Sequence, residues 1–410
     1  MSAPPPLRRL GVSAPLPGDQ VALYDPLGVS ASAAGGLLIG LEEWTWAQGF
    51  DGETGVVELA QRIGLGARGP VQPEAIAALA EHLSREHLLE DARFRSAQER
   101  AFEEFRRCER RVALGAGTEY PSDPFDLRVR LGGVVADDWY MPRLAGALAI
   151  WAPGGPLPNA SGLYGRAWAS VRHARDEIDR IVVLGSVGAP LSQLLVPLAK
   201  DFETPLGPVA VDRAALAELG VLPGRDQLAH ARASVIERQV LLARLLFPTT
   251  PVVPLLVGAL ETDGDPRSDE RVEAALAGLD RIVAMEGRTL IVAAADLYHL
   301  RAPHAGTEGG PRGTLMAGAR GADISGCDRR ALDAVDELDA EAFADIALGD
   351  GDPGRASQAA ATYLLLRHLE GRPEFEAGEL RSSILGYLQC PAPQVLFSAG
   401  AAVFYREVAW

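Results

Sequence analysis

Short apolar runs alternate with amphipathic stretches through the second part of the chain. Continuous apolar runs occupy 146–152, 180–185, 250–258 and 289–296, and helical patterns lie between them. A strand that is apolar at every position is typical of a sheet covered on both faces. The pattern therefore predicts an α/β fold in which a largely parallel sheet has helices on both sides.

The first part of the chain has a different pattern. Residues 1–20 are rich in proline, and we expect them to form a flexible lead. A short alternating strand is predicted at 19–26, followed by amphipathic helices within 51–66 and 72–91. Short strands followed by helices at this length predict a winged-helix-like α+β domain over 21–95.

Two boundaries follow from the change of pattern. Residues 96–114 are predicted to be a connecting helix, and the larger α/β domain is predicted to span 115–410. Within it, one long helix is predicted over 226–247. A second helix is predicted from Ser268, as its N-cap, to a stop at Gly287.

Composition limits the classes of partner. The formal net charge of −16 disfavours non-specific binding to nucleic acid or anionic membrane. Three cysteines with no CxxC pair favour a reducing compartment, so we expect a cytoplasmic protein. The longest apolar stretch, 240–260, is interrupted by Arg244 and three prolines and does not predict a membrane span.

Several segments of the second part, taken together, resemble the Memo family, whose bacterial branch is called AmmeMemoRadiSam system protein B. They are "RIVVLGSVGAPLS" at 180–192, "FETPLGPVAVD" at 202–212, "PVVPLLVGAL" at 251–260, "LIVAAADLYHL" at 290–300 and "LFSAGAAVF" at 396–404. "VALYDPLG" at 21–28 and "GTEYPSDP" at 117–124 extend the resemblance over nearly the whole chain.

The resemblance implies a fold shared with class III extradiol dioxygenases, with His and Cys residues at strand ends that bind a metal in some members. Imidazole and thiolate suit iron or copper. In this sequence, the positions that match most of those ligands carry other residue types: Gly154, Gly188 with Ala189, Ser234 and Asp350.

Three ionisable residues remain at matching positions: Glu237, Asp296 and His299. One His and two carboxylates are compatible with Fe(II) in principle. They are also compatible with a structural role, in which Asp296 and His299 hold a turn through hydrogen bonds. The rest of the expected cavity lining consists of Gly154, Ser186, Gly188, Ser234, Tyr298 and Asp350.

Two functional hypotheses follow. In the first, the chain is a pseudoenzyme that binds a protein or peptide partner, with no metal or cofactor. The family's system name makes a radical-SAM enzyme a possible partner by resemblance. In the second, the chain is an iron- or copper-dependent oxidoreductase that uses Glu237, Asp296 and His299. A Ser186–His299–Asp296 triad is a third reading, but no G-x-S-x-G elbow precedes Ser186.

Overall fold

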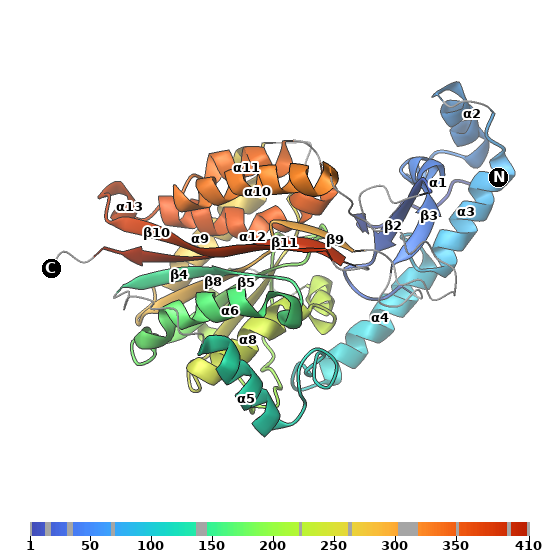
Figure 1. Cartoon of the computed structure of the whole chain (residues 1–410). Helices are drawn as coiled ribbons and strands as arrows, with labels where there is room; N and C mark the ends of the chain where they lie inside the picture. The colour runs from blue at the N-terminus through green and yellow to red at the C-terminus, as the bar shows by residue number, and fades with distance from the viewer. Residues whose placement is uncertain are drawn as a thin grey trace.

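The chain folds as two units joined by a long helix (Figure 1). The computed structural model describes residues 2–12, 18–30, 36–66, 70–136, 146–220, 224–260, 265–301, 319–349, 352–391 and 395–407. Among these residues, no helix combines the length and the apolar character needed to cross a membrane.

The N-terminal unit is a three-stranded antiparallel sheet, in the order β1-β2-β3, packed against three helices. The elements are β1 Gly11–Val12, β2 Gln20–Tyr24, β3 Leu37–Gly40, α1 Leu41–Ala47, α2 Val56–Gly66 and α3 Pro73–Arg85. The alternating strand expected at 19–26 is confirmed as β2. The winged-helix interpretation of this unit stays a prediction.

Residues 2–12 differ from the flexible lead that we expected. Leu7 forms a β-bridge with Leu89, and Gly11–Val12 pairs with β2. The buried Arg8 guanidinium donates to Asp25 Oδ1 at 2.7 Å and to the carbonyl oxygen of His87 at 2.6 Å. The prediction from proline content was wrong for these residues because their apolar and cationic side chains have partners distant in sequence.

Helix α4, Ala92–Arg107, leads from the N-terminal unit to the larger one (Figure 1). It ends earlier than the predicted connecting helix, because Cys108 is extended, with φ −68° and ψ 121°. The chain then runs alongside 201–203, where Arg111 N donates to the carbonyl oxygen of Asp201 at 2.8 Å. The segment after α4 is therefore already part of the larger unit.

The larger unit contains an eight-stranded sheet in the order β10-β11-β4-β8-β5-β7-β6, with β9 paired to one end of β11. Strands β4, β8, β5 and β7 are parallel to one another, and the flanking pairs are antiparallel. The strands are β4 Ala147–Ala152, β5 Arg180–Ser186, β6 Leu195–Pro197, β7 Val252–Val257, β8 Thr289–Ala294, β9 Tyr298–Arg301, β10 Leu380–Pro391 and β11 Val395–Arg406.

Helices cover both faces of this sheet, which confirms the predicted α/β arrangement (Figure 1). Helices α6 and α8 pack on one face, and α10 and α12 on the other. Every residue of β5, β7 and β8 is buried, as their nearly continuous apolar sequences predict. The helices of this unit are α5 Pro124–Val135, α6 Leu157–Val171, α7 Arg213–Glu218, α8 Ser234–Leu246, α9 Glu270–Val283, α10 Ala319–Asp336, α11 Ala340–Leu348, α12 Pro353–Glu370 and α13 Pro373–Glu376, with short 3-10 turns at Arg172–Ala174, Arg225–Ala231 and Pro266–Ser268.

Three local predictions need correction. The long helix expected at 226–247 is divided into a 3-10 turn and α8, because Ala233 is extended, with ψ 112°. The N-cap of α9 is Asp269, whose side chain accepts from Arg271 N, rather than Ser268. Strand β10, which the hydrophobic pattern did not indicate, lies at the sheet edge with most of its central residues only partly buried.

Candidate functional site

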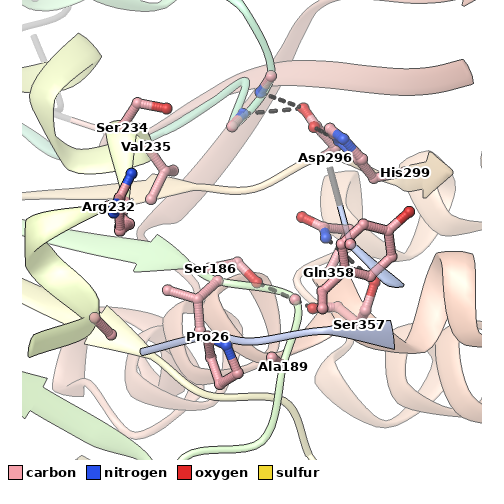
Figure 2. A pocket seen from close by; sticks show the side chains of 18 of the residues that line it. Pro26, Ser186, Ala189, Arg232, Ser234, Val235, Asp296, His299, Ser357 and Gln358 are labelled. Carbon is pink, nitrogen blue, oxygen red and sulfur yellow. Dashed lines mark hydrogen bonds and ion pairs between the residues drawn. The ribbon is translucent and has the colours of Figure 1, made fainter. Parts of the chain in front are cut away.

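A cavity of about 510 Å³ lies where the parallel strands end (Figure 2). The last residue of β5, Ser186, lies in its wall, and the loops after β4, β5 and β8 contribute Gly154, residues 187–189 and Asp296. In α/β sheets this carboxyl edge is where ligands usually bind, because the loops are free to diverge there. The same edge was expected to carry the site.

The N-terminal unit forms part of the same cavity. Val12, the segment 23–26, Gly28, Ser30 and Gly36 line it from that side. The Asp25 carboxylate shapes this wall, since it accepts from the amides of Val29 and Ser30 at 2.6 and 2.7 Å. The cavity is therefore a space between two units, which the pattern of either unit alone does not predict.

Asp296 and His299 are brought together at one side of the cavity (Figure 2). Asp296 Oδ1 accepts from the amides of Gly154 and Gly155, both at 3.0 Å. Asp296 Oδ2 lies 2.8 Å from His299 Nδ1. An ionised carboxylate only accepts hydrogen bonds, so Nδ1 carries the proton in this pair, and the uncharged form of this imidazole has its lone pair on Nε2.

The imidazole of His299 is held in place by more than Asp296. Its ring stacks on Phe397 of β11, with centroids 6.1 Å apart and an interplanar angle of 26°. The His299 side chain is 20% exposed, whereas that of Asp296 is 1% exposed. The buried acid and the stacked ring fix an imidazole that remains accessible from the cavity.

The glycines after β4 allow the backbone to approach Asp296 closely. A Cβ at Gly155 would lie 3.2 Å from Asp296 Oδ2 and 3.1 Å from the Phe397 ring.

The loop after β5 also contains a glycine that a side chain could not replace easily. At Gly188, where φ is +67°, a Cβ would lie 2.9 Å from Gln358 Nε2. A side chain at Gly188 would therefore be strained and would displace Gln358.

An ion pair that is largely buried lies behind the loop after β4. Arg238 of α8 donates from Nε and Nη2 to the two oxygens of Glu119, at 2.6 and 3.1 Å, and from Nη1 to the carbonyl oxygen of Gly154 at 2.6 Å. Burial opposes the charge of Arg238, but the neighbouring Tyr164 and Glu119 raise the pKa of its guanidinium overall. Glu119 also accepts from Leu157 N, the first residue of α6, at 2.7 Å.

Glu237 does not line this cavity. Its side chain is 1% exposed and forms an ion pair with the equally buried Arg111. Glu237 also accepts from the amides of Leu114 and Gly115, at 2.9 and 2.8 Å, and from the hydroxyl of Tyr120. Its oxygens are thus occupied by donors that fasten the segment after α4 to α8.

The surroundings of Glu237 are strongly desolvated. Burial lowers the pKa of Arg111 to about 10 and raises that of Tyr120 to about 12. Arg111 also donates from Nε to the carbonyl oxygen of His230, at 3.1 Å. Burial lowers the pKa of His230 to about 3, and its Nε2 bonds to the carbonyl oxygen of Val196 at 2.9 Å. This cluster resembles a structural anchor rather than a reactive site.

The remaining expected lining residues divide into three groups. Gly154, Ser186, Gly188 and Ser234 line the cavity. Tyr298 is fully buried and is not part of the lining; the Arg355 guanidinium lies 5.7 Å from its ring centre. Asp350 lies outside the described residues.

The residues expected to hold iron or copper do not assemble into a ligand set. Glu237 is held by Arg111, and Asp296 is held by two amides and His299. His299 Nε2 is the donor atom that remains. Across the described ranges, no group of three or more His, Cys, Asp or Glu side chains could hold a metal ion.

The proposed nucleophilic triad is not formed either. Ser186 Oγ donates to the carbonyl oxygen of Ser357 at 3.2 Å. Within the part of the chain that is described, no hydrogen bond joins Ser186 to His299. Ser357 and Gln358 come instead from the start of α12 and line the cavity beside His299 (Figure 2).

Seven lining residues with hydrogen-bonding side chains were not predicted from the sequence: Tyr24, Asp25, Ser30, Arg232, Arg238, Ser357 and Gln358. Arg232 precedes the interruption that divides the predicted long helix, and α8 begins at Ser234 without a side-chain cap. A local signal for this break is weak, because alanine and arginine favour helix continuation.

One comparison with known proteins gives a match. The sequence model of Memo-like proteins matches residues 110–350, more than half of the chain. The match begins just after α4 and includes the loops after β4, β5 and β8. No curated protein matches this chain.

Proposed function

This chain belongs to the Memo-like protein family, and from that premise we propose that it is a non-catalytic binding protein. Its cavity at the carboxyl edge of the sheet receives a ligand the size of a short peptide segment, supplied by a peptide or protein partner. A radical-SAM enzyme as that partner remains a prediction from the family resemblance.

One observation carries this proposal: the carboxylates of Glu237 and Asp296 are already occupied by hydrogen bonds within the protein. Glu237 bonds to Arg111, Tyr120 and two amides, and Asp296 bonds to two amides and His299. Ligation of a metal by either carboxylate would require these bonds to break. Removing a partner from a buried charged group is strongly unfavourable.

The size and lining of the cavity support a binding role. Its volume of about 510 Å³ falls within the range typical of ligand sites. Ser186, Ser234, Ser357 and Gln358 offer neutral hydrogen-bonding groups beside apolar walls such as Val187 and Val235. Such a mixture fixes the orientation of a ligand without requiring a reaction.

Metal analysis tests the non-catalytic part of the proposal. The full chain is incubated anaerobically with Fe(II), or aerobically with Cu(II), then desalted and assayed for metal. We expect substoichiometric metal and the same melting temperature as the untreated protein. Stoichiometric metal in the wild type that is lost in both His299→Ala and Asp296→Asn would overturn this part.

Ligand-observed NMR tests the binding part. The probe is N-acetylphenylalaninamide, a neutral model of a peptide segment. We expect saturation transfer to the probe with the wild type and its loss in Ser234→Trp, where the indole fills the cavity. The matched control is Ser96→Trp, because Ser96 is exposed on α4 and does not line the cavity. Equal signals in the two variants would place binding elsewhere.

An enzymatic role has one specific observation in its favour, the Asp296–His299 pair at 2.8 Å. A carboxylate that orients an imidazole is the arrangement used in general acid–base catalysis. The NMR sample, followed over a day, tests this role. A new product that forms with the wild type and not with His299→Ala would favour the enzyme over the binding protein.

A further inference from the structure

Among the residues that the structure describes, each charged side chain that lines the cavity has a side-chain or backbone partner, with one exception. The Asp25 carboxylate is paired with Arg8 at 2.7 Å, and Asp296 is held by His299 and two amides. Arg238 is paired with Glu119 through two hydrogen bonds. Of the arginine and carboxylate side chains lining the cavity, Arg232 alone has no ion pair or side-chain hydrogen bond to another described residue.

Arg232 is held at the boundary between the two units. Its side chain lies over Gly28 of the N-terminal unit, so close that a Cβ there would be 2.5 Å from Arg232 Cγ. Gly28 has a φ of +66°, so glycine meets both the conformational and the spatial requirement at this position. The aliphatic part of the Arg232 side chain therefore packs on Gly28, although Arg232 as a whole is an exposed residue.

Arg232 has no carboxylate partner among the described residues, although it lies on the wall of a cavity. The sequence has 55 acidic and 39 basic side chains, so carboxylates are in excess. The first turn of α8, at Ser234 and Val235, adds partial positive charge beside Arg232 and has no side-chain cap. Arg232 and Ser234 lie on one side of the cavity, and His299 and Gln358 lie on the other (Figure 2).

Resting on the proposed binding function, we infer that the cavity selects a ligand that carries one carboxylate group, and that Arg232 binds this group. The remainder of the ligand extends toward His299 and Gln358. In its uncharged form, His299 offers the Nε2 lone pair, which accepts from an amide or hydroxyl of the ligand.

The charge balance favours a carboxylate over a phosphate. Within the described lining, Arg232 is the one cation without a partner, and a monoanion matches its single charge, whereas a phosphate dianion adds a second negative charge to a cavity that already holds Asp25 and Asp296. The planar guanidinium fork also matches the two oxygens of a carboxylate. A free organic acid and the C-terminus of a peptide both present this group.

Calorimetric titration of the full chain, at fixed pH and ionic strength, compares N-acetylphenylalanine with its neutral amide. We expect the acid to bind about tenfold to hundredfold more tightly, which is the usual effect of a charged hydrogen bond. Arg232→Gln removes this preference and leaves the affinity for the amide unchanged. The control is Arg128→Gln, an exposed arginine of α5 outside the cavity, and it keeps the preference.

Further probes identify the source of the carboxylate and the alternative anion. Tighter binding of N-acetylphenylalanine than of 3-phenylpropionate indicates a peptide C-terminus, and the reverse indicates a free acid; both support the carboxylate. Inorganic phosphate that binds more tightly than either acid overturns the inference. So does equal affinity for the acid and the amide in the wild type, although the binding function then stands. Absence of binding by every probe overturns the binding function itself.

Discussion

Glu237 and Asp296 are both almost fully buried carboxylates that accept hydrogen bonds from two backbone amides. They differ in their third partner. Glu237 bonds to the buried Arg111, within a closed region between α8 and the segment after α4. Asp296 bonds to His299, whose ring opens on the cavity. Of these two buried acids, only Asp296 therefore has a partner that a ligand in the cavity can reach.

The largest expected effect tests the closed region. Glu237→Gln keeps the size of the side chain and leaves Arg111 buried without a counter-ion. We expect the free energy of unfolding, measured with urea, to fall by about 3–5 kcal/mol. The matched control is Glu99→Gln, since Glu99 pairs with Arg225 at the surface, with both side chains about half exposed. That change is expected to cost less than about 1 kcal/mol.

Asp296→Asn tests the Asp296–His299 pair beside the cavity. The asparagine oxygen keeps the bonds to Gly154 and Gly155, but its NH₂ group then faces His299 Nδ1. The imidazole is expected to move its proton to Nε2, which changes this atom from an acceptor to a donor for the ligand. Nitrogen-15 chemical shifts of His299 report this tautomer change directly. We expect a loss of about 1–3 kcal/mol in stability; an unchanged tautomer would contradict the assignment.

The pH dependence of stability is a further test of the closed region around Glu237. It depends on the buried His230, whose carbonyl oxygen accepts from Arg111. Burial lowers its pKa to about 3 in the native state, whereas an unfolded histidine titrates near 6.5. As the pH falls from 7 to 5, His230 becomes protonated in the unfolded chain but stays neutral in the native state. Stability is therefore expected to fall by about 2 kcal/mol over this interval. His230→Gln should flatten this slope, as measured by urea unfolding at each pH.

The smallest expected stability effect is that of Arg232→Gln. Because Arg232 is exposed and has no ion pair among the described residues, we expect a change within about 0.5 kcal/mol of zero. The melting temperature measures this effect without any ligand. A substantial loss would mean that Arg232 has a structural partner, and it would then resemble Arg111 rather than a ligand-binding residue.

Much of the fold could be predicted from local sequence. Nearly continuous apolar segments become the buried strands β5, β7 and β8, because a residue flanked by helices on both faces of a sheet has no contact with water. Asp296 and His299 could be placed at a strand end because they follow directly on one of these apolar segments. The edge strand β10 escaped prediction because its residues are mostly half-buried and lack a clear pattern.

The sequence by itself determined the central parallel strands, most of the helices and the edge of the sheet at which a site would lie, because these depend on the spacing of apolar residues. Tertiary structure decided which charged residues are compensated. Glu237 and Arg111 are 126 positions apart, and Arg232 meets Gly28 across the two units. Electrostatic pairing depends on distance in space, so one buried carboxylate became an anchor and another an oriented partner of an accessible imidazole.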